Sequence, residues 1–189
     1  GLETSFANGG QISASHSAPW ATPEVPFQLL KWFGKEDAPL LYRLNLDSAL
    51  WRWSIRFLLN CTAARLKFNT FNNLQLALYS RSLFQELRRK TEIVYDVKTR
   101  GILQIYRNIK TMDNAIAHAE WLNQLGCHNN ILSQKTCFSL EPALKESDTL
   151  ILGGIHTPDD ESGDAYSFTF NVANKASNNG VKFQYCLLY

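Results

Sequence analysis

The sequence of 189 residues lacks most of the motifs by which enzymes are usually identified. It contains no G-x-S-x-G, H-E-x-x-H, Walker or G-x-G-x-x-G motif. The four cysteines, at positions 61, 127, 137 and 186, include no C-x-x-C pair, so we expect free thiols rather than a zinc or redox site. No apolar run approaches the ~20 residues that a membrane-spanning helix needs, which disfavours an integral membrane protein.

Charge is nearly balanced, with 19 basic and 17 acidic residues and a formal net charge of +2. A dedicated nucleic-acid binder normally carries a basic stripe, so the composition disfavours that class. The four histidines are scattered, and we expect each to be an ordinary surface or core residue. Asp159, Asp160, Glu161 and Asp164 could bind a cation, but their order differs from that of an EF-hand. We therefore expect a turn followed by a helix cap there, and no metal site.

Apolar periodicity predicts three helices in the first half of the chain. We expect them over residues 27–33, 47–59 and 68–90, the first ending at Gly34. Asp47 or Ser48 can cap the second helix, because both side chains accept hydrogen bonds from exposed backbone N–H groups. The basic run at 88–90 suits the negative end of the third helix dipole, and we expect it to be solvated.

The pattern changes after residue 92, where β-branched and alternating residues indicate strands among the helices. Thr111 is expected to cap a helix that Gly126 closes, and Gly180 is expected to end the last helix. We expect strands over 93–95, 101–106, 150–155 and 181–185, and helices over 111–125, 134–140 and 165–179. These elements predict an α+β fold, and taken alone they indicate a soluble domain without a stated function.

The chain opens with a polar segment, ETSFANGGQIS at 3–13, that has neither a helical period nor a clean strand alternation. This segment and SAPW at 17–20 resemble the small subunits of bacterial D-amino acid dehydrogenases. Those proteins belong to the wider group of D-amino acid oxidase-like and glycine oxidase-like, FAD-dependent oxidoreductases. The resemblance runs through nearly the whole chain, in DAPL at 37–40, WRW at 51–53, FLLNC at 57–61, RGIL at 100–103, LEPAL at 140–144 and TPDDESGDA at 157–165.

The resemblance implies an FAD-dependent enzyme that oxidatively deaminates D-amino acids. The substrate would give its α-hydrogen as hydride to the flavin, and the imino acid would hydrolyse to a 2-oxo acid and ammonia. A respiratory acceptor, rather than oxygen, would take the electrons. The resemblance also implies that the opening loop passes alongside the flavin, where small residues let the backbone approach closely. The implied FAD-binding residues are Thr4, Ser5, Asn8, Gly9, Gly10 and Gln11, and no catalytic residue is assigned.

The same resemblance predicts a substrate-binding domain combined with partial Rossmann-like FAD-binding segments. Residues 1–24 would be a loop of the FAD domain, 25–150 mostly the substrate-binding domain, and 151–189 a return to the FAD domain. The family's dinucleotide fingerprint and its C-terminal half are missing, so we expect an internal fragment. The arginine that would bind the substrate carboxylate stays unassigned, since nothing places Arg100 or Arg107 at the flavin.

Two other hypotheses stay open at this point. The chain could be a truncated, non-catalytic remnant of such an enzyme, or an interaction module whose aromatic helix around 51–53 docks a partner or a membrane. A helix buried in the core explains the same aromatic pattern more simply. The resemblance implies a location in the cytoplasm, or peripheral on the cytoplasmic side of the bacterial inner membrane.

Overall fold

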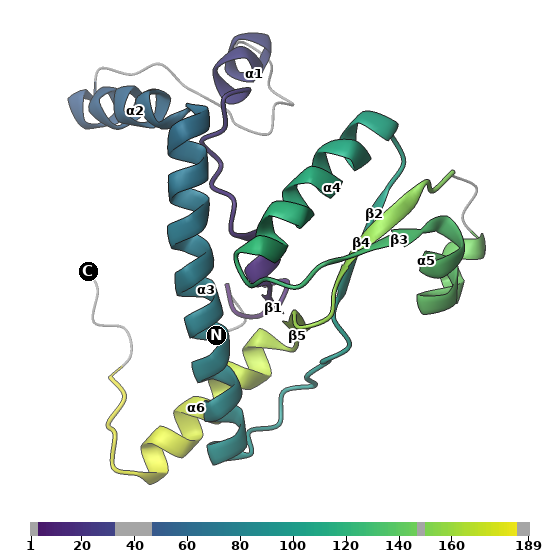
Figure 1. Ribbon diagram of the computed structural model, residues 1–189. Helices are drawn as coiled ribbons and strands as arrows, with labels where there is room; N and C mark the ends of the chain where they lie inside the picture. Colours follow the sequence, from purple (N-terminus) through teal and green to yellow (C-terminus); the bar gives the residue numbers. More distant parts are fainter. Residues whose placement is uncertain (1–3, 33–46, 147–149, 185–189) are drawn as a thin grey trace. The chain divides into compact units, whose positions relative to one another are not determined.

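The computed structural model of the chain describes residues 4–32, 47–146 and 150–184 (Figure 1). Helices make up most of these residues and antiparallel strands a smaller part, which is consistent with the predicted α+β class. The chain divides into two compact units. The first unit combines residues 1–15 with 78–189, and the second comprises residues 16–77.

The second unit is built from helices: α1 (Val25–Trp32), α2 (Ser48–Asn60) and the first part of α3 (Ala63–Thr91). Asp47, one of the two predicted candidates, caps α2. Its carboxylate accepts the N–H of Ala49 at 2.8 Å. The side chain of Asn73 on α3 donates to the carbonyl oxygen of Ser17 at 3.0 Å, which attaches the segment after residue 16 to the helix. The predicted helix end at Gly34 lies outside the described residues.

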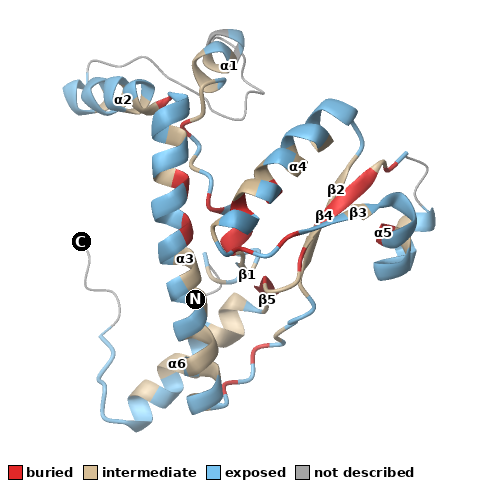
Figure 2. Ribbon diagram, in the orientation of Figure 1, coloured by how far each residue is buried: buried red, intermediate tan, exposed pale blue. Residues whose placement is uncertain are grey.

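The core of the first unit is a three-stranded antiparallel sheet with the order β2–β4–β3. The strands are β2 (Ile102–Tyr106), β3 (Asn130–Ser133) and β4 (Gly153–Thr157), and Figure 2 shows β4 as the buried central strand. Helices α4 (Ile109–Gln124) and α5 (Gln134–Leu140) pack on this sheet. Met112 of α4 approaches Gly153, and Cys137 of α5 approaches Gly154. Because consecutive strand residues face opposite sides, the two helices cover opposite faces.

A second, two-stranded sheet joins the opening loop to the segment that follows β4. It pairs β1 (Gln11–Ile12) with β5 (Glu161–Ser162) in antiparallel register and leads into α6 (Ala165–Asn178). Short 3₁₀ helices follow β1 at Ala14–His16 and α5 at Pro142–Glu146. Phe84 of α3, Tyr95 and Phe168 of α6 form an aromatic cluster with ring centroids 4.7–5.9 Å apart. This cluster holds α6 against the second half of α3.

Two predicted strands are absent from the described part of the chain. Residues 93–95 form no strand, because the backbone turns at Glu92 and Asp96, which have φ values of 52° and 51°. Ile93 and Tyr95 are nevertheless buried, which explains why their pattern resembled a strand. Residues 181–184 form no strand either, and Tyr185 lies outside the described residues.

Several predicted boundaries also differ. Asn108, not Thr111, caps α4, because the Asn108 side chain accepts the N–H of Thr111 at 3.2 Å. Helix α3 begins at residue 63 instead of 68, and β4 covers 153–157 instead of 150–155. Strands β1, β3 and β5 are only two to four residues long, and such short segments carry no readable alternation.

The two compact units do not coincide with the predicted segments 1–24, 25–150 and 151–189. Those segments describe parts of a longer, two-domain enzyme, whereas the units describe how the residues of this chain cluster. The assignment of the segments to two domains stays a prediction.

Two neighbouring glycines offer a test of how the opening loop is attached. Gly10 has a φ of 61°, and a Cβ there would overlap the carbonyl oxygen of Gly163, whereas a Cβ on Gly9 would meet no atom within 4 Å. We expect Gly10→Ala to lower the free energy of unfolding by about 2 kcal/mol and Gly9→Ala to change it by less than about 0.5 kcal/mol. Urea unfolding measures both, and equal effects would contradict the close contact.

Candidate functional site

An open groove of about 370 Å³ lies in the first unit, between the opening loop and the start of α6. Three of the six predicted FAD-binding residues, Ser5, Asn8 and Gly9, line it. The rest of the lining comes from Phe6, Asp96, Lys98, Ser162, Gly163, Asp164 and Ala165. The groove therefore lies where three segments far apart in the sequence meet.

The other predicted residues support the groove or lie beside it. The Asn8 side chain accepts the N–H of Gly10 at 2.8 Å, and the carbonyl oxygen of Gly10 accepts the N–H of Gly163 at 2.9 Å. Gln11 pairs with Ser162 between β1 and β5. Thr4 is exposed and does not line the groove. Gly10 and Gln11 therefore fasten the loop, and Ser5, Phe6, Asn8 and Gly9 line the open space.

Acidic side chains dominate the charge of the groove. Asp164 caps α6 by accepting the N–H of Ser167 at 2.8 Å, and this hydrogen bond holds the pKa of the Asp164 carboxyl below its ordinary value. Lys98 pairs with Asp96 at 2.7 Å. Two carboxylates and one ammonium group thus leave a net negative charge, and a carboxylate already occupies the helix N-terminus that would otherwise attract a phosphate.

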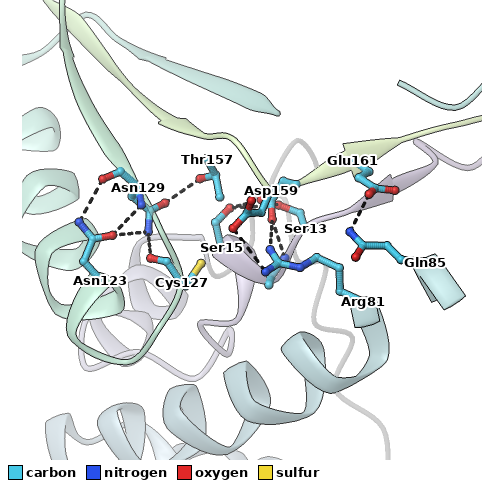
Figure 3. A network of polar contacts seen from close by, with 12 residues as sticks. Ser13, Ser15, Arg81, Gln85, Asn123, Cys127, Asn129, Thr157, Asp159 and Glu161 are labelled. Atoms are coloured by element: carbon cyan, nitrogen blue, oxygen red, sulfur yellow. Dashed lines mark hydrogen bonds and ion pairs between the residues drawn. The ribbon is translucent and has the colours of Figure 1, made fainter. Parts of the chain in front are cut away.

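Beside the groove, the fully buried carboxylate of Asp160 organises the segment after β1. It accepts hydrogen bonds from Ser13 Oγ at 2.5 Å, Ser15 Oγ at 2.6 Å and the N–H of Ala14 at 3.0 Å. Arg81 of α3 lies 3.8 Å from the same carboxylate. Figure 3 shows Arg81, Ser13 and Ser15 in this network. Four groups from two distant segments therefore compensate for the burial of one charge.

The next residue, Glu161, forms a largely buried ion pair with α3. It pairs with Arg88, accepts a hydrogen bond from Gln85 at 2.8 Å, and Arg88 also donates to the Tyr95 hydroxyl at 3.1 Å. Burial alone would raise the pKa of Glu161, but the hydrogen bonds from Arg88 and Gln85 outweigh it, so the pKa is lowered. The carboxylate in turn raises the pKa of Arg88. The prediction that the run 88–90 is solvated is therefore wrong for Arg88.

A neutral network on the other side of Asp160 links α4 to β4. Thr157 Oγ1 donates to Asn129 Oδ1 at 2.6 Å, and Asn129 Nδ2 donates to the carbonyl oxygen of Cys127 at 2.7 Å. Asn123 accepts the backbone N–H of Asn129 at 2.6 Å (Figure 3). Burial and the nearby Asp160 carboxylate raise the pKa of the Cys127 thiol. It is therefore a poor nucleophile.

The acidic cluster at 159–164 acts within the protein as capping and ion-pairing groups, in agreement with the predicted turn and helix cap. In the described ranges, no group of three or more histidine, cysteine or acidic residues could hold a metal ion. The cysteines at 61, 127 and 137 are free thiols, and Cys186 lies outside those ranges. No helix in the described part of the chain is long and apolar enough to cross a membrane.

Sequence reasoning missed the two arginines that pair with this acidic turn. Arg81 and Arg88 are seven residues apart, so two helical turns place them on the same face of α3. That spacing could have predicted that the two arginines share a face of α3. It could not have predicted that Asp160 and Glu161 are their partners, because pairing between positions more than seventy residues apart leaves no local pattern.

Residues 1–186 match the family model described as DAO, FAD-dependent oxidoreductase. The chain therefore belongs to this family of FAD-dependent oxidoreductases. It is 49% identical to the D-amino acid dehydrogenase of Paramagnetospirillum magneticum over 186 residues, and 44% identical to that of Dechloromonas aromatica over 187 residues. These alignments cover 98% and 99% of this chain but 44% and 45% of the relatives, so the chain spans less than half the length of these relatives.

Solved structures show the same fold family. The glycine oxidase of Geobacillus kaustophilus matches with a TM-score of 0.57 and 18% identity, over 95% of this chain and 36% of that one. The glycine oxidase of Bacillus cereus matches with a TM-score of 0.50 and 26% identity, over 57% of this chain and 30% of that one. The chain thus has part of the fold of FAD-dependent oxidoreductases.

Adjacent aspartates test the role assigned to the buried carboxylate. In Asp160→Asn, one donor to the former carboxylate faces an amide N–H₂ group and Arg81 loses a charge partner. We expect a loss of about 3–5 kcal/mol in the free energy of unfolding. Asp159→Asn removes one pairing at 3.6 Å from a half-exposed carboxylate, so we expect a loss below about 1 kcal/mol. Chemical denaturation that ranks the variants in the opposite order would contradict this assignment.

The ion pair of Glu161 predicts a specific dependence of stability on pH. Its pKa is lower in the folded state, so its contribution is fully present above the ordinary glutamate value of about 4.3 and is lost as the pH falls through the folded pKa. We expect Glu161→Gln to be less stable than the parent chain by about 3 kcal/mol at pH 7, because Arg88 keeps its charge without a partner.

The difference between the two proteins should shrink as the pH falls below about 4, because the unfolded parent chain then binds a proton that the folded carboxylate does not yet bind. Urea unfolding at a series of pH values measures it. Glu120→Gln, at an exposed position of α4, is the control and should leave the pH profile unchanged. A stability difference for Glu161→Gln that stays constant down to pH 3 would contradict this role.

Proposed function

We propose that this chain is part of an FAD-dependent D-amino acid dehydrogenase, which oxidatively deaminates D-amino acids to 2-oxo acids and ammonia. The observation that carries the proposal is the 49% identity to a D-amino acid dehydrogenase over 98% of the chain, within a family of FAD-dependent oxidoreductases. Further relatives with that name are 39–44% identical over nearly the whole chain. Because these relatives are called dehydrogenases, we propose a respiratory acceptor, rather than oxygen, as the electron acceptor.

We further propose that the antiparallel sheet belongs to the substrate-binding domain and the opening loop to the FAD-binding domain. Rossmann-like domains are built on parallel strands, whereas β2, β3 and β4 pair antiparallel. Since β4 extends to Thr157, the return to the FAD-binding part is better placed after that residue than at residue 151. The β1–β5 ribbon and α6 would then accompany the opening loop.

The groove offers a test of whether these residues suit FAD. Ser5, Asn8 and Gly9 present small and polar groups beside the ring of Phe6, and the open space beside Gly9 lets a ligand approach its backbone. The two carboxylates of Asp96 and Asp164 oppose a pyrophosphate. The groove therefore suits an uncharged part of the cofactor, the ribityl chain or the polar edge of the ring.

In this proposal the protein supplies position and shape. Bound flavin would supply the hydride acceptor, since the hydride that leaves the substrate α-carbon carries both electrons of the oxidation. Asn8 holds the loop through the N–H of Gly10, and the Asp160 network holds the segment that follows it. These contacts keep residues 5–9 in one conformation, which lowers the entropy cost of binding.

Cofactor binding can be tested at Gly9, where a larger side chain would enter the groove without striking the protein. We expect the purified chain to bind FAD, and Gly9→Val to weaken binding at least about tenfold because its methyl groups occupy ligand space. Ala7→Val changes an exposed residue that does not line the groove, and it should bind FAD like the parent chain. Titration followed by flavin fluorescence measures all three.

The outcomes decide whether the groove of this chain holds the cofactor by itself. Saturable binding that Gly9→Val weakens would support the groove as the cofactor site, and D-alanine oxidation with an artificial acceptor would then be assayed. Equal affinity of both valine variants would place the cofactor elsewhere. No binding by the parent chain would leave the family assignment standing and would mean that the 189 residues need the rest of a longer protein to hold the cofactor.

A further inference from the structure

The opening loop contains a dipeptide whose own chemistry the proposed function does not use. The sequence has two asparagines that are directly followed by glycine, in the pairs Asn8–Gly9 and Asn179–Gly180. In such a pair the glycine nitrogen can attack the side-chain carbonyl carbon of the asparagine, because glycine has no side chain that restricts the approach. Both asparagines are exposed, so solvent access does not distinguish the two pairs.

The contacts of Asn8 favour this reaction. Its Oδ1 accepts the N–H of Gly10 at 2.8 Å, and this hydrogen bond closes a ring of atoms that contains both Asn8 Cγ and the Gly9 nitrogen. When the nitrogen attacks, negative charge develops on Oδ1, which the N–H of Gly10 already contacts and can stabilise. Gly9 donates no backbone hydrogen bond to another described residue, and a Cβ on Gly9 would meet no atom within 4 Å. The attacking nitrogen is therefore free to move toward Cγ.

The contacts of Asn179 oppose the same reaction. This residue is the C-cap of α6, and its Nδ2 donates to the carbonyl oxygen of Lys175 at 2.8 Å. The N–H of Gly180 donates to the carbonyl oxygen of Ser177 at 2.9 Å. Helix carbonyls thus hold both the leaving nitrogen and the attacking nitrogen, and the end of the helix must open before attack. The two pairs share a dipeptide and differ in structure.

We propose that Asn8–Gly9 is a site of spontaneous covalent modification, at which Asn8 becomes an aspartate or an isoaspartate residue. The Gly9 nitrogen gives its proton to a solvent base and bonds to Asn8 Cγ. The Cγ–Nδ2 bond then breaks, and Nδ2 takes a proton from solvent and leaves as ammonia. Water opens the resulting cyclic imide at either carbonyl carbon and supplies the oxygen of the new carboxylate. The sum is the hydrolysis of one amide by water, with no oxidant or reductant.

The modification changes the charge and the shape of the groove that Asn8 lines. The groove already contains the carboxylates of Asp96 and Asp164. One ammonium group, that of Lys98, balances them only in part. A carboxylate at position 8 adds a third negative charge, and an isoaspartate also inserts a methylene group into the main chain before Gly9. The loop then no longer presents an uncharged surface to a ligand.

The consequence for cofactor binding rests on the proposed function and is measured separately from the modification. Asn8→Asp reproduces one product and should weaken FAD binding at least about fivefold, because the cofactor would cover an unpaired charge. Asn114→Asp makes the same change at an exposed position of α4 outside the groove and should bind FAD like the parent chain. Equal affinity of the two variants, in a chain that is modified at Asn8, would support the modification site and contradict the groove as the cofactor site.

Peptide mapping by mass spectrometry tests the modification without reference to FAD. The purified chain is incubated in mildly alkaline buffer, either folded or in guanidinium chloride, and trypsin then releases Asn8 and Asn179 in separate peptides, residues 1–31 and 176–182. In the folded chain we expect Asn8 to be converted at least about tenfold faster than Asn179, because each hydrogen bond that must open costs about a factor of five. In the denatured chain the two rates should agree within about twofold, since both sites have lost their structure.

The matched variant Gly9→Ala tests the attacking nitrogen. Its methyl group meets no protein atom but restricts the backbone, so conversion of Asn8 should slow about two- to fivefold while that of Asn179 is unchanged. Labelling by an isoaspartyl methyltransferase gives an independent readout of the isoaspartate product. The proposal is overturned if Asn8 stays unconverted in the folded chain. It is also overturned if the ratio of the two rates is the same in the folded and the denatured chain.

Discussion

The burial of two adjacent carboxylates, Asp160 and Glu161, is the constraint on which the first unit depends. Removing a carboxylate from water costs several kcal/mol unless partners replace the lost hydration. Here the partners come from three distant segments: the backbone and hydroxyls of residues 13–15, the α3 arginines, and Tyr95 through Arg88. Each segment must be in place before the charges can be buried, so the interaction ties the opening loop, α3 and the turn after β4 into one arrangement.

This arrangement also explains the character of the candidate site. The carboxylates that hold the loop point into the protein, while Asp96 and Asp164, with Lys98, face the groove. The loop residues 5–9 are thereby presented without a positive charge of their own. Such a surface complements uncharged polar groups better than phosphates.

Local chemistry accounts for the elements that were predicted correctly. Helix α2 with its cap at Asp47, α5 and α6 follow from apolar spacing, capping side chains and the positive φ of 90° at Gly180. The failures arise where distant contacts outweigh local preference. Ile93 and Tyr95 have strand-forming side chains but are buried in an irregular segment, and β1 exists because β5 lies beside it. The candidate cofactor residues of the opening loop were found by resemblance alone, because the loop carries no recognisable motif of its own.

The sequence by itself determined the family, the helical first half and the acidic turn that caps α6. Short sequence motifs, apolar periodicity and capping residues are all properties of neighbouring positions. Only the tertiary structure decided that Ser5, Asn8 and Gly9 line a groove while Gly10 and Gln11 fasten the loop. It also decided that Arg81 and Arg88 pair with the acidic turn and that Trp51 and Trp53 of α2 are exposed. The physical reason is that burial and ion pairing depend on which distant segments meet, and no local pattern encodes that meeting.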